Sequence, residues 1–172
     1  LNEYAIMTLQ LKRAIKFICL TMAFPIGILC GLGEPVLQRW LGDDFTDLAM
    51  LLFIIMIPWL VSISTKPCTA LFRGTDNAKI PALVTLLIGV FNVGIAIILV
   101  SKTNLGLYAI GISLLICLTA KNFVFTTMYA AKISGVPKYT FMQSVISGCI
   151  AFFAVYIIGR VLANMYFLAT LP

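Results

Sequence analysis

The run IPALVTLLIGVFNVGIAIILV at residues 80–100 decides the fold class. It contains no charged residue, and its length matches the roughly 20 apolar residues that an α-helix needs to cross a bilayer. A strand of a transmembrane barrel is about half as long and alternates in polarity. The run therefore predicts a transmembrane helix and disfavours a barrel.

Four further apolar runs of similar length flank this one, at residues 14–32, 48–65, 105–128 and 141–162. The segments between them are short and rich in Gly, Pro and Asp, which are residues typical of turns. Short links force neighbouring helices to run antiparallel. The sequence thus predicts an all-α integral membrane protein, an antiparallel bundle of about five transmembrane helices in one membrane domain covering residues 1–172.

Composition supports this class and excludes others. The chain is 62% hydrophobic and 10% charged, with a mean hydropathy of +1.08, whereas soluble domains are about half apolar. The net charge of +6 does not indicate nucleic-acid binding, because the basic residues are scattered between apolar runs. There is no His, no C-x-x-C pair and no Walker-type phosphate loop. We therefore expect no metal site, no cofactor and no enzymatic activity.

The chain begins with Leu1 rather than Met, and no cleavable signal peptide is visible. We therefore expect a fragment of a longer protein, whose remaining helices would be partners of this one. Residues 1–13 are mixed in character, with Ile6, Leu9 and Arg13 spaced like one helical face. They predict an elbow helix along the inner membrane surface, and a continuation of the first span is the alternative.

Loop charges predict the orientation, because Lys and Arg favour the cytoplasmic side. With a cytoplasmic N-terminal end, the inner segments hold eight basic residues: Lys12, Arg13, Lys16, Lys66, Arg73, Lys79, Lys132 and Lys138. The outer loops hold two, Arg39 and Lys102. Arg160 lies inside an apolar run near its outer end, and we expect it to snorkel to the surface.

Small and polar residues mark helix contacts in membranes. In the third span Thr85, Gly89, Asn92 and Ala96 are spaced like one face. This predicts that Asn92 faces protein and that Gly89 lies in a helix contact. Leu87, Phe91 and Ile98 would then meet lipid. Asn92 near the bilayer centre serves either an interhelical hydrogen bond or a transport path.

The fourth span repeats the pattern with Gly106, Ala109, Ser113, Cys117 and Lys121. An ionisable group inside an apolar run usually faces a bundle interior or a wet path. Lys121 also lies about 16 residues, or roughly 24 Å, from the outer end of this run, so that it could snorkel to the inner surface. The sequence is therefore compatible both with a Lys121 that faces the bundle interior and with one that snorkels to the inner membrane surface.

Two prolines, Pro25 and Pro58, lie inside the first and second spans. Each removes one backbone hydrogen bond and favours a kink. Kinked helices can bend during transport, but static bundles contain them as well.

Three segments together resemble a known family. They are the stretch 34–42 (EPVLQRWLG), the stretch 67–81 (PCTALFRGTDNAKIP), and the stretch 91–111 with its Phe91-Asn92-Val93 and Asn104-Leu105-Gly106. In order and spacing they are similar to polysaccharide (O-antigen type) flippases of the multidrug/oligosaccharidyl-lipid/polysaccharide exporter superfamily. Residues 108–112 depart from the family pattern, which more often has a small residue after the Gly.

The resemblance implies part of the C-terminal lobe of a two-lobed transporter with 12–14 helices, although the corresponding stretch of the N-terminal lobe is an alternative. It implies a flippase that moves an isoprenoid-pyrophosphate-linked oligosaccharide across the bacterial inner membrane by alternating access, in polysaccharide biosynthesis such as that of O-antigen and lipopolysaccharide. Substrate and membrane lipids would be its partners. The transport-path candidates are Lys121, Asn92, Ser113 and Thr85. A cation-coupled multidrug exporter and a non-transporting membrane assembly module are the alternatives.

Overall fold

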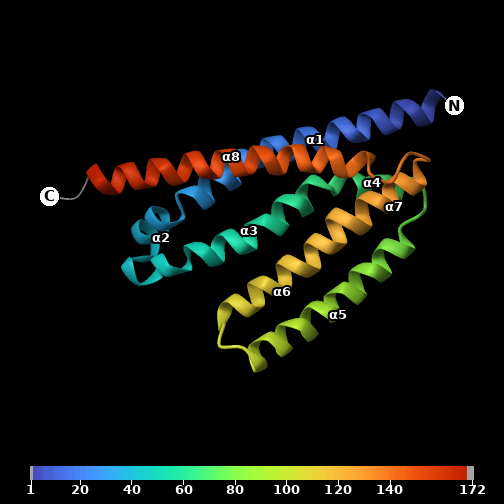
Figure 1. Ribbon diagram of the computed structural model, residues 1–172. Coiled ribbons are helices and arrows are strands. Elements are labelled where there is room, and N and C mark those ends of the chain that lie inside the picture. The colour runs from blue at the N-terminus through green and yellow to red at the C-terminus, as the bar shows by residue number, and fades with distance from the viewer. Residues whose placement is uncertain (1, 170–172) are drawn as a thin grey trace.

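The computed structural model describes residues 2–169, and within that range it is helical with no strand. The helices, labelled in Figure 1 where there is room, are α1 (Asn2–Gly31), α2 (Gly33–Leu41), η1 (Asp43–Leu48), α3 (Ala49–Ser64), α4 (Lys66–Gly74), α5 (Lys79–Lys102), α6 (Leu107–Thr119), η2 (Ala120–Thr126), α7 (Thr127–Ile133) and α8 (Thr140–Ala169).

Five helical stretches of the described chain are long and apolar enough to cross a membrane: Ala5–Gly31, Asp43–Gly74, Lys79–Lys102, Leu107–Ile133 and Thr140–Met165. The fourth joins α6, η2 and α7 into one span. The predicted all-α integral membrane fold is therefore confirmed, and each predicted span falls within or close to an observed one.

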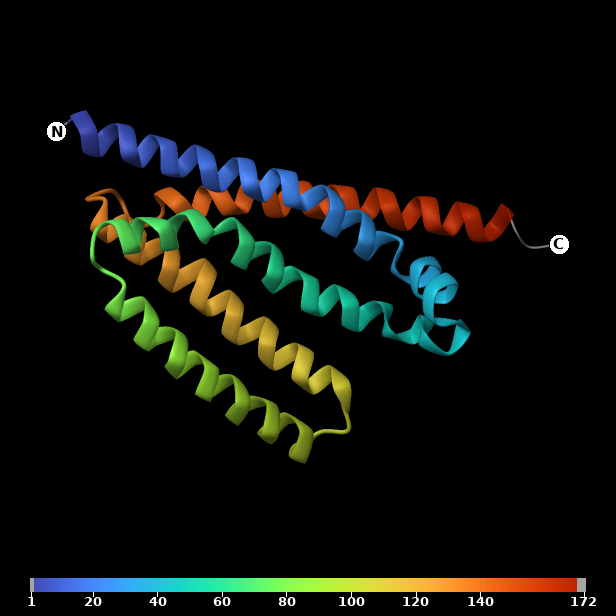
Figure 2. The ribbon, with the colours of Figure 1, turned by 180° about the vertical axis from the view of Figure 1, so that it is seen from behind.

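Successive spans run in opposite directions and pack in the order α8, α1, α3, α6, α5 (Figure 1; Figure 2 shows the same order from behind). The first and last spans, α1 and α8, run in the same direction side by side and form the most extensive contact of the bundle. The α5–α6 hairpin lies at the opposite edge, and α5 packs mainly on α6 and η2. The bundle is thus open along α5.

Glycines let α1 and α8 approach each other closely. A Cβ atom at Gly31 would lie 2.8 Å from the Tyr156 carbonyl oxygen and 2.9 Å from Gly159 Cα. At Gly148 it would lie 2.2 Å from Cys19 Sγ. Without a hydrophobic drive between helices in lipid, such backbone contact is a main source of helix association.

The first span differs from the prediction at its start. α1 is one unbroken helix from Asn2 to Gly31, so the predicted elbow is wrong and the continuation of the first span is observed. Both internal prolines, Pro25 and Pro58, lie within continuous helices, α1 and α3. Their proposed role as bending points stays a prediction.

Two segments read as turns are short helices instead. α2 and α4 each carry a proline in their first turn, Pro35 and Pro67. Proline fits that position because the backbone N–H groups there have no partner within the helix. Trp40 of α2 is 83% exposed, which suits the membrane–water interface.

The predicted contact face of the third span is partly wrong. Asn92 and Ala96 are half-buried, but Thr85 and Gly89 are exposed, and a Cβ at Gly89 would meet nothing within 4 Å. The face that packs on α6 is shifted round the helix toward larger residues, Val84, Ile88 and Leu99. The residues expected to meet lipid, Leu87, Phe91 and Ile98, are exposed as predicted.

A matched pair of glycine substitutions tests the α1–α8 contact. Gly148→Ala places a methyl group against Cys19, and we expect the overpacking to lower the free energy of unfolding by about 1–3 kcal/mol. Gly89→Ala adds the same group in mid-helix with open space around it, so stability should hold or rise. The stability of both variants is measured by heating the protein in detergent and using size-exclusion chromatography to determine the fraction that stays folded at each temperature. Equal midpoints for the two variants would show that α1 and α8 are not packed this closely.

Candidate functional site

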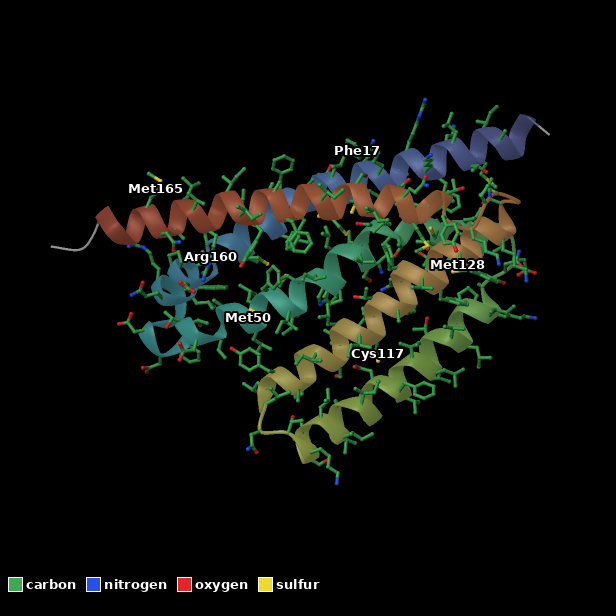
Figure 3. The ribbon with its side chains drawn as sticks, in the orientation of Figure 1. Phe17, Met50, Cys117, Met128, Arg160 and Met165 are labelled. Carbon is green, nitrogen blue, oxygen red and sulfur yellow. The ribbon has the colours of Figure 1, made fainter. Side chains whose placement is uncertain are left out.

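A π-helical segment, η2, interrupts the fourth span between α6 and α7. It lies between Cys117 and Met128, which Figure 3 labels on that span. Within it the Thr126 hydroxyl donates a hydrogen bond of 3.1 Å to the Lys121 carbonyl oxygen, five residues earlier. Such segments are rare and occur frequently at functional sites. The segment contains neither Gly nor Pro, which are the residues that usually indicate a helix irregularity in a sequence. The sequence therefore did not predict it.

The π segment changes which residues face the bundle. Ala109, Ser113 and Cys117 are buried, as predicted. The inward face then advances by five residues instead of four, so that Asn122 is 5% exposed while Lys121 is half-buried. Sequence reasoning with a regular helical period singled out Lys121 and missed Asn122.

Lys121 is half-buried within the fourth span, and Lys66 is exposed at the start of α4. In the described part of the chain neither forms an ion pair, since the ion pair found there joins Arg160 to Glu34. Neither lysine therefore has a neutralising carboxylate among the described residues. We call the position of Lys121 the lysine site.

Buried polar atoms without partners occur beside Lys121 in sequence and on the neighbouring helix α5. Among the described residues, Asn122 Nδ2 and Thr119 Oγ1 have no hydrogen-bond partner, and neither does Asn92 Oδ1 on the neighbouring helix α5. Asn92 is about ten residues from the end of α5, and Cys117 is about ten residues into α6, so the antiparallel pair brings them to a similar depth. Unpaired amides inside a membrane are costly. The fourth span and α5 thus hold polar groups that could receive water or a ligand.

The other transport-path candidates are satisfied within their own helices. Ser113 is buried and donates a hydrogen bond of 2.9 Å to the Ile110 carbonyl oxygen. Thr85 is exposed on the outward side of α5 and donates to the Pro81 carbonyl oxygen at 2.7 Å. The structure therefore places Lys121 and Asn122 on the fourth span and Asn92 on α5, which packs against that span, and leaves Thr85 exposed.

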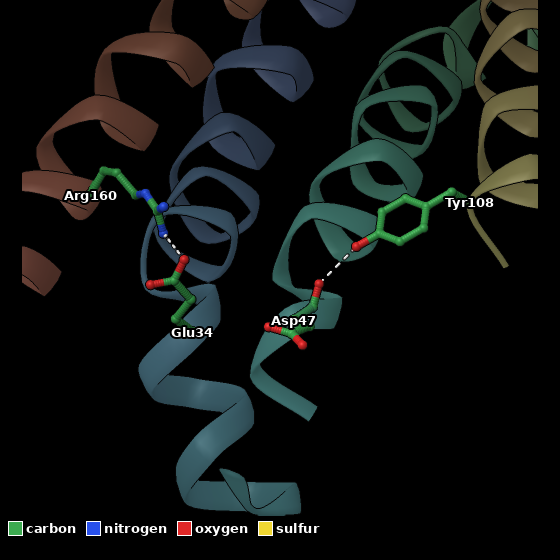
Figure 4. A network of polar contacts seen from close by, with 4 residues as sticks. All are labelled: Glu34, Asp47, Tyr108 and Arg160. Carbon is green, nitrogen blue, oxygen red and sulfur yellow. Dashed lines mark hydrogen bonds and ion pairs between the residues drawn. The ribbon is translucent and has the colours of Figure 1, made fainter. Parts of the chain in front are cut away.

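The opposite end of the bundle is held by polar contacts of a different kind (Figure 4). Arg160 of α8 donates a hydrogen bond of 2.7 Å to Glu34 of α2, forming an ion pair with both side chains substantially exposed. Tyr108 of α6 donates to the Asp47 carbonyl oxygen at 2.8 Å. Arg160 thus has a carboxylate partner there, which the sequence reading did not foresee.

No group of three or more His, Cys, Asp or Glu residues in the described part of the chain could hold a metal ion. The five cysteines are free thiols. Four of them are buried and the fifth, Cys149, is half-buried, which suits small apolar side chains in a helix bundle.

Comparison with known proteins gives one informative match. No protein-family model and no solved structure matches this chain. It is similar to the "Uncharacterized membrane protein EpsK" of Bacillus subtilis (strain 168), with 37% identity over 135 residues, 78% of this chain and 27% of that relative. The chain thus spans about 27% of the relative's length. The relative's description and the five apolar spans together support a multi-pass membrane location.

Thiol labelling can test whether the lysine site is wet. In a background without native cysteines, we expect Lys121→Cys to react with a water-soluble maleimide, because the π segment and its unpaired polar groups favour water there. Val124→Cys is the control, since Val124 belongs to the same segment but is an exposed apolar residue that should face lipid. Labelling is read on membranes by a gel shift. Equal reaction at both positions, or none at position 121, contradicts a water-filled site.

Proposed function

We propose that this chain is part of a polysaccharide flippase that moves an isoprenoid-pyrophosphate-linked oligosaccharide, of the O-antigen kind, across the bacterial inner membrane. The single observation that carries this proposal is Lys121, a half-buried cation within the fourth span that has no ion-pair partner among the described residues. An ammonium group inside a membrane gains from a bound anion, and a pyrophosphate carries several charges close together.

The unpaired groups on the fourth span and α5 support the same proposal. A lipid-linked sugar presents many hydroxyl groups. Each can donate a hydrogen bond to an amide oxygen or accept one from an amide N–H group. Asn122 Nδ2 and Asn92 Oδ1 offer one donor and one acceptor of this kind. A hydrogen bond made inside a low-dielectric site is worth more than one made in water.

The distribution of acidic residues favours this proposal over a cation-coupled exporter. Four acids, Glu34, Asp43, Asp44 and Asp47, lie around α2 and η1, and Asp76 follows α4. Coupling sites for protons or sodium commonly include a carboxylate inside the membrane. No described acidic side chain lies midway along a span.

The proposal includes an orientation with the lysine site at the cytoplasmic side, where the substrate would be collected. It rests on the segregation of charge between the ends: α4, α7 and the first half of α1 carry Lys66, Arg73, Lys132, Lys12, Arg13 and Lys16. Single cysteines at Asp44 and Lys79, treated with an impermeant thiol reagent on intact cells, check it. We expect labelling at position 44 only, and strong labelling at position 79 would reverse the orientation.

Substitutions of Lys121 test the proposed function. In the full-length protein, Lys121→Ala removes a charged hydrogen bond worth roughly 1.5–3 kcal/mol, so we expect substrate flipping to fall by about ten-fold or more. Lys121→Arg keeps the charge and should retain more activity. Lys102→Ala is the control, because Lys102 is an exposed lysine at the far end of α5. Complementation of a flippase-deficient strain, with membrane levels of each variant checked, gives the readout.

The Gln variant decides between the two readings of Lys121. If the side chain only snorkels to the membrane surface, Lys121→Gln should be nearly silent. If it binds the pyrophosphate, Gln should resemble Ala, because a neutral amide cannot replace the charge. Full activity of both the Ala and Gln variants would remove Lys121, and with it the structural support, from the proposed mechanism.

A further inference from the structure

A second basic region lies away from the lysine site, where the first half of α1 passes the loop between α7 and α8. A cavity of about 770 Å³ opens there. Its lining includes Leu9 and Lys12 from α1, and Ile133, Ser134, Gly135 and Val136 from the end of α7 and the following loop. We call this cavity the α1–loop cleft.

The charge around the α1–loop cleft is positive. Lys12 and Lys16 are four residues apart on α1, so they lie on one side of the helix. Lys132 and Lys138 lie one and two residues in sequence from Ile133 and Val136 of the other wall, and all four of these side chains are exposed. The sequence has no Asp or Glu between residues 5 and 31, nor between residues 127 and 140. Among the side chains that the structure describes, both walls of the cleft therefore carry or adjoin basic residues and no acidic one.

The rest of the lining of the α1–loop cleft is largely apolar, with Thr8 and Ser134 as its hydroxyl groups. Ile133 and Val136 are half-buried and Leu9 is 48% exposed. Ser134 is only 7% exposed, and its hydroxyl has no hydrogen-bond partner among the described residues. Gly135 has a left-handed φ of +66°, which bends the loop away and leaves open space at its Cα. An unpaired buried hydroxyl calls for a ligand or water.

We propose that the α1–loop cleft binds an anionic phospholipid, with the headgroup phosphate beside Lys12 and an acyl chain along Leu9 and Val136. A soluble anion would use the cations but not the apolar wall. A zwitterionic lipid would use the apolar wall but gain little from four uncompensated lysines. The cleft lies at the end of the membrane-spanning helices, which is the level of lipid headgroups. This proposal stands independently of the flippase proposal.

The test counts lipids on the full-length protein by native mass spectrometry after titration with phosphatidylglycerol or phosphatidylcholine. We expect tighter binding of phosphatidylglycerol, weakened about five-fold by Lys12→Gln, because each lysine near anionic lipid contributes about that factor. Adding Ser134→Ala to Lys12→Gln should weaken the binding of phosphatidylglycerol further. Lys102→Gln is the control, since it removes the same charge from an exposed lysine at the far end of α5, and it should leave binding unchanged.

Three results would overturn the proposal. The first is equal weakening by Lys12→Gln and Lys102→Gln, which would mean that overall charge alone attracts the lipid. The second is equal affinity for the two lipids. The third is displacement of phosphatidylglycerol by millimolar inorganic phosphate, which would mean that the cleft recognises a free anion. Lys12→Arg is a second control, because it changes the same position but keeps the positive charge. It should bind phosphatidylglycerol like the wild-type protein.

Discussion

The close contact between α1 and α8 sets the arrangement of the rest of the bundle. The two helices are the first and last spans, yet Gly31 and Gly159 bring their backbones together. Lipid tails are as apolar as the side chains, so two helices gain no hydrophobic free energy by packing together. Shape and close approach therefore decide which helices associate. Once α1 and α8 are paired, α3 packs on α1, α6 packs on α3, and α5 is left at the edge with its outer face uncovered. The open edge is thus the end of this packing series that lies farthest from the α1–α8 contact.

The sequence predicted the spans because hydropathy is a property of length and composition alone. It also predicted the buried series Ala109, Ser113 and Cys117, where the helical period is regular. It failed at Gly89, because small residues mark a contact only when a neighbouring helix reaches them, and α6 meets α5 on another side. It failed at α2 and α4, because a proline in a first helical turn looks the same in sequence as a proline in a loop.

The π segment was beyond sequence reasoning for a different reason. A π turn breaks the regular hydrogen-bond pattern of an α-helix and is rare. It therefore depends on the packing around it, which a single sequence does not reveal. In this chain the packing of the fourth span against both α3 and α5 supplies that context. The shift by one residue explains why Asn122, and not Lys121, is the deeper side chain. A regular period places Lys121 on the same face as Cys117, and the observed geometry turns it away from the most buried face, so that it is half-buried.

The position of the polar groups bears on how a charged substrate could be held without blocking its release. Lys121 is half-buried and Lys66 is exposed, so both ammonium groups keep part of their hydration and would bind an anion more weakly than fully buried charges. A carrier needs this balance, because it must release what it binds. The unpaired atoms Asn92 Oδ1 and Asn122 Nδ2 are buried, where hydrogen bonds are stronger but carry no net charge. A partly hydrated charge together with buried neutral hydrogen-bonding groups would suit a substrate that is anionic at one end and a sugar along the rest.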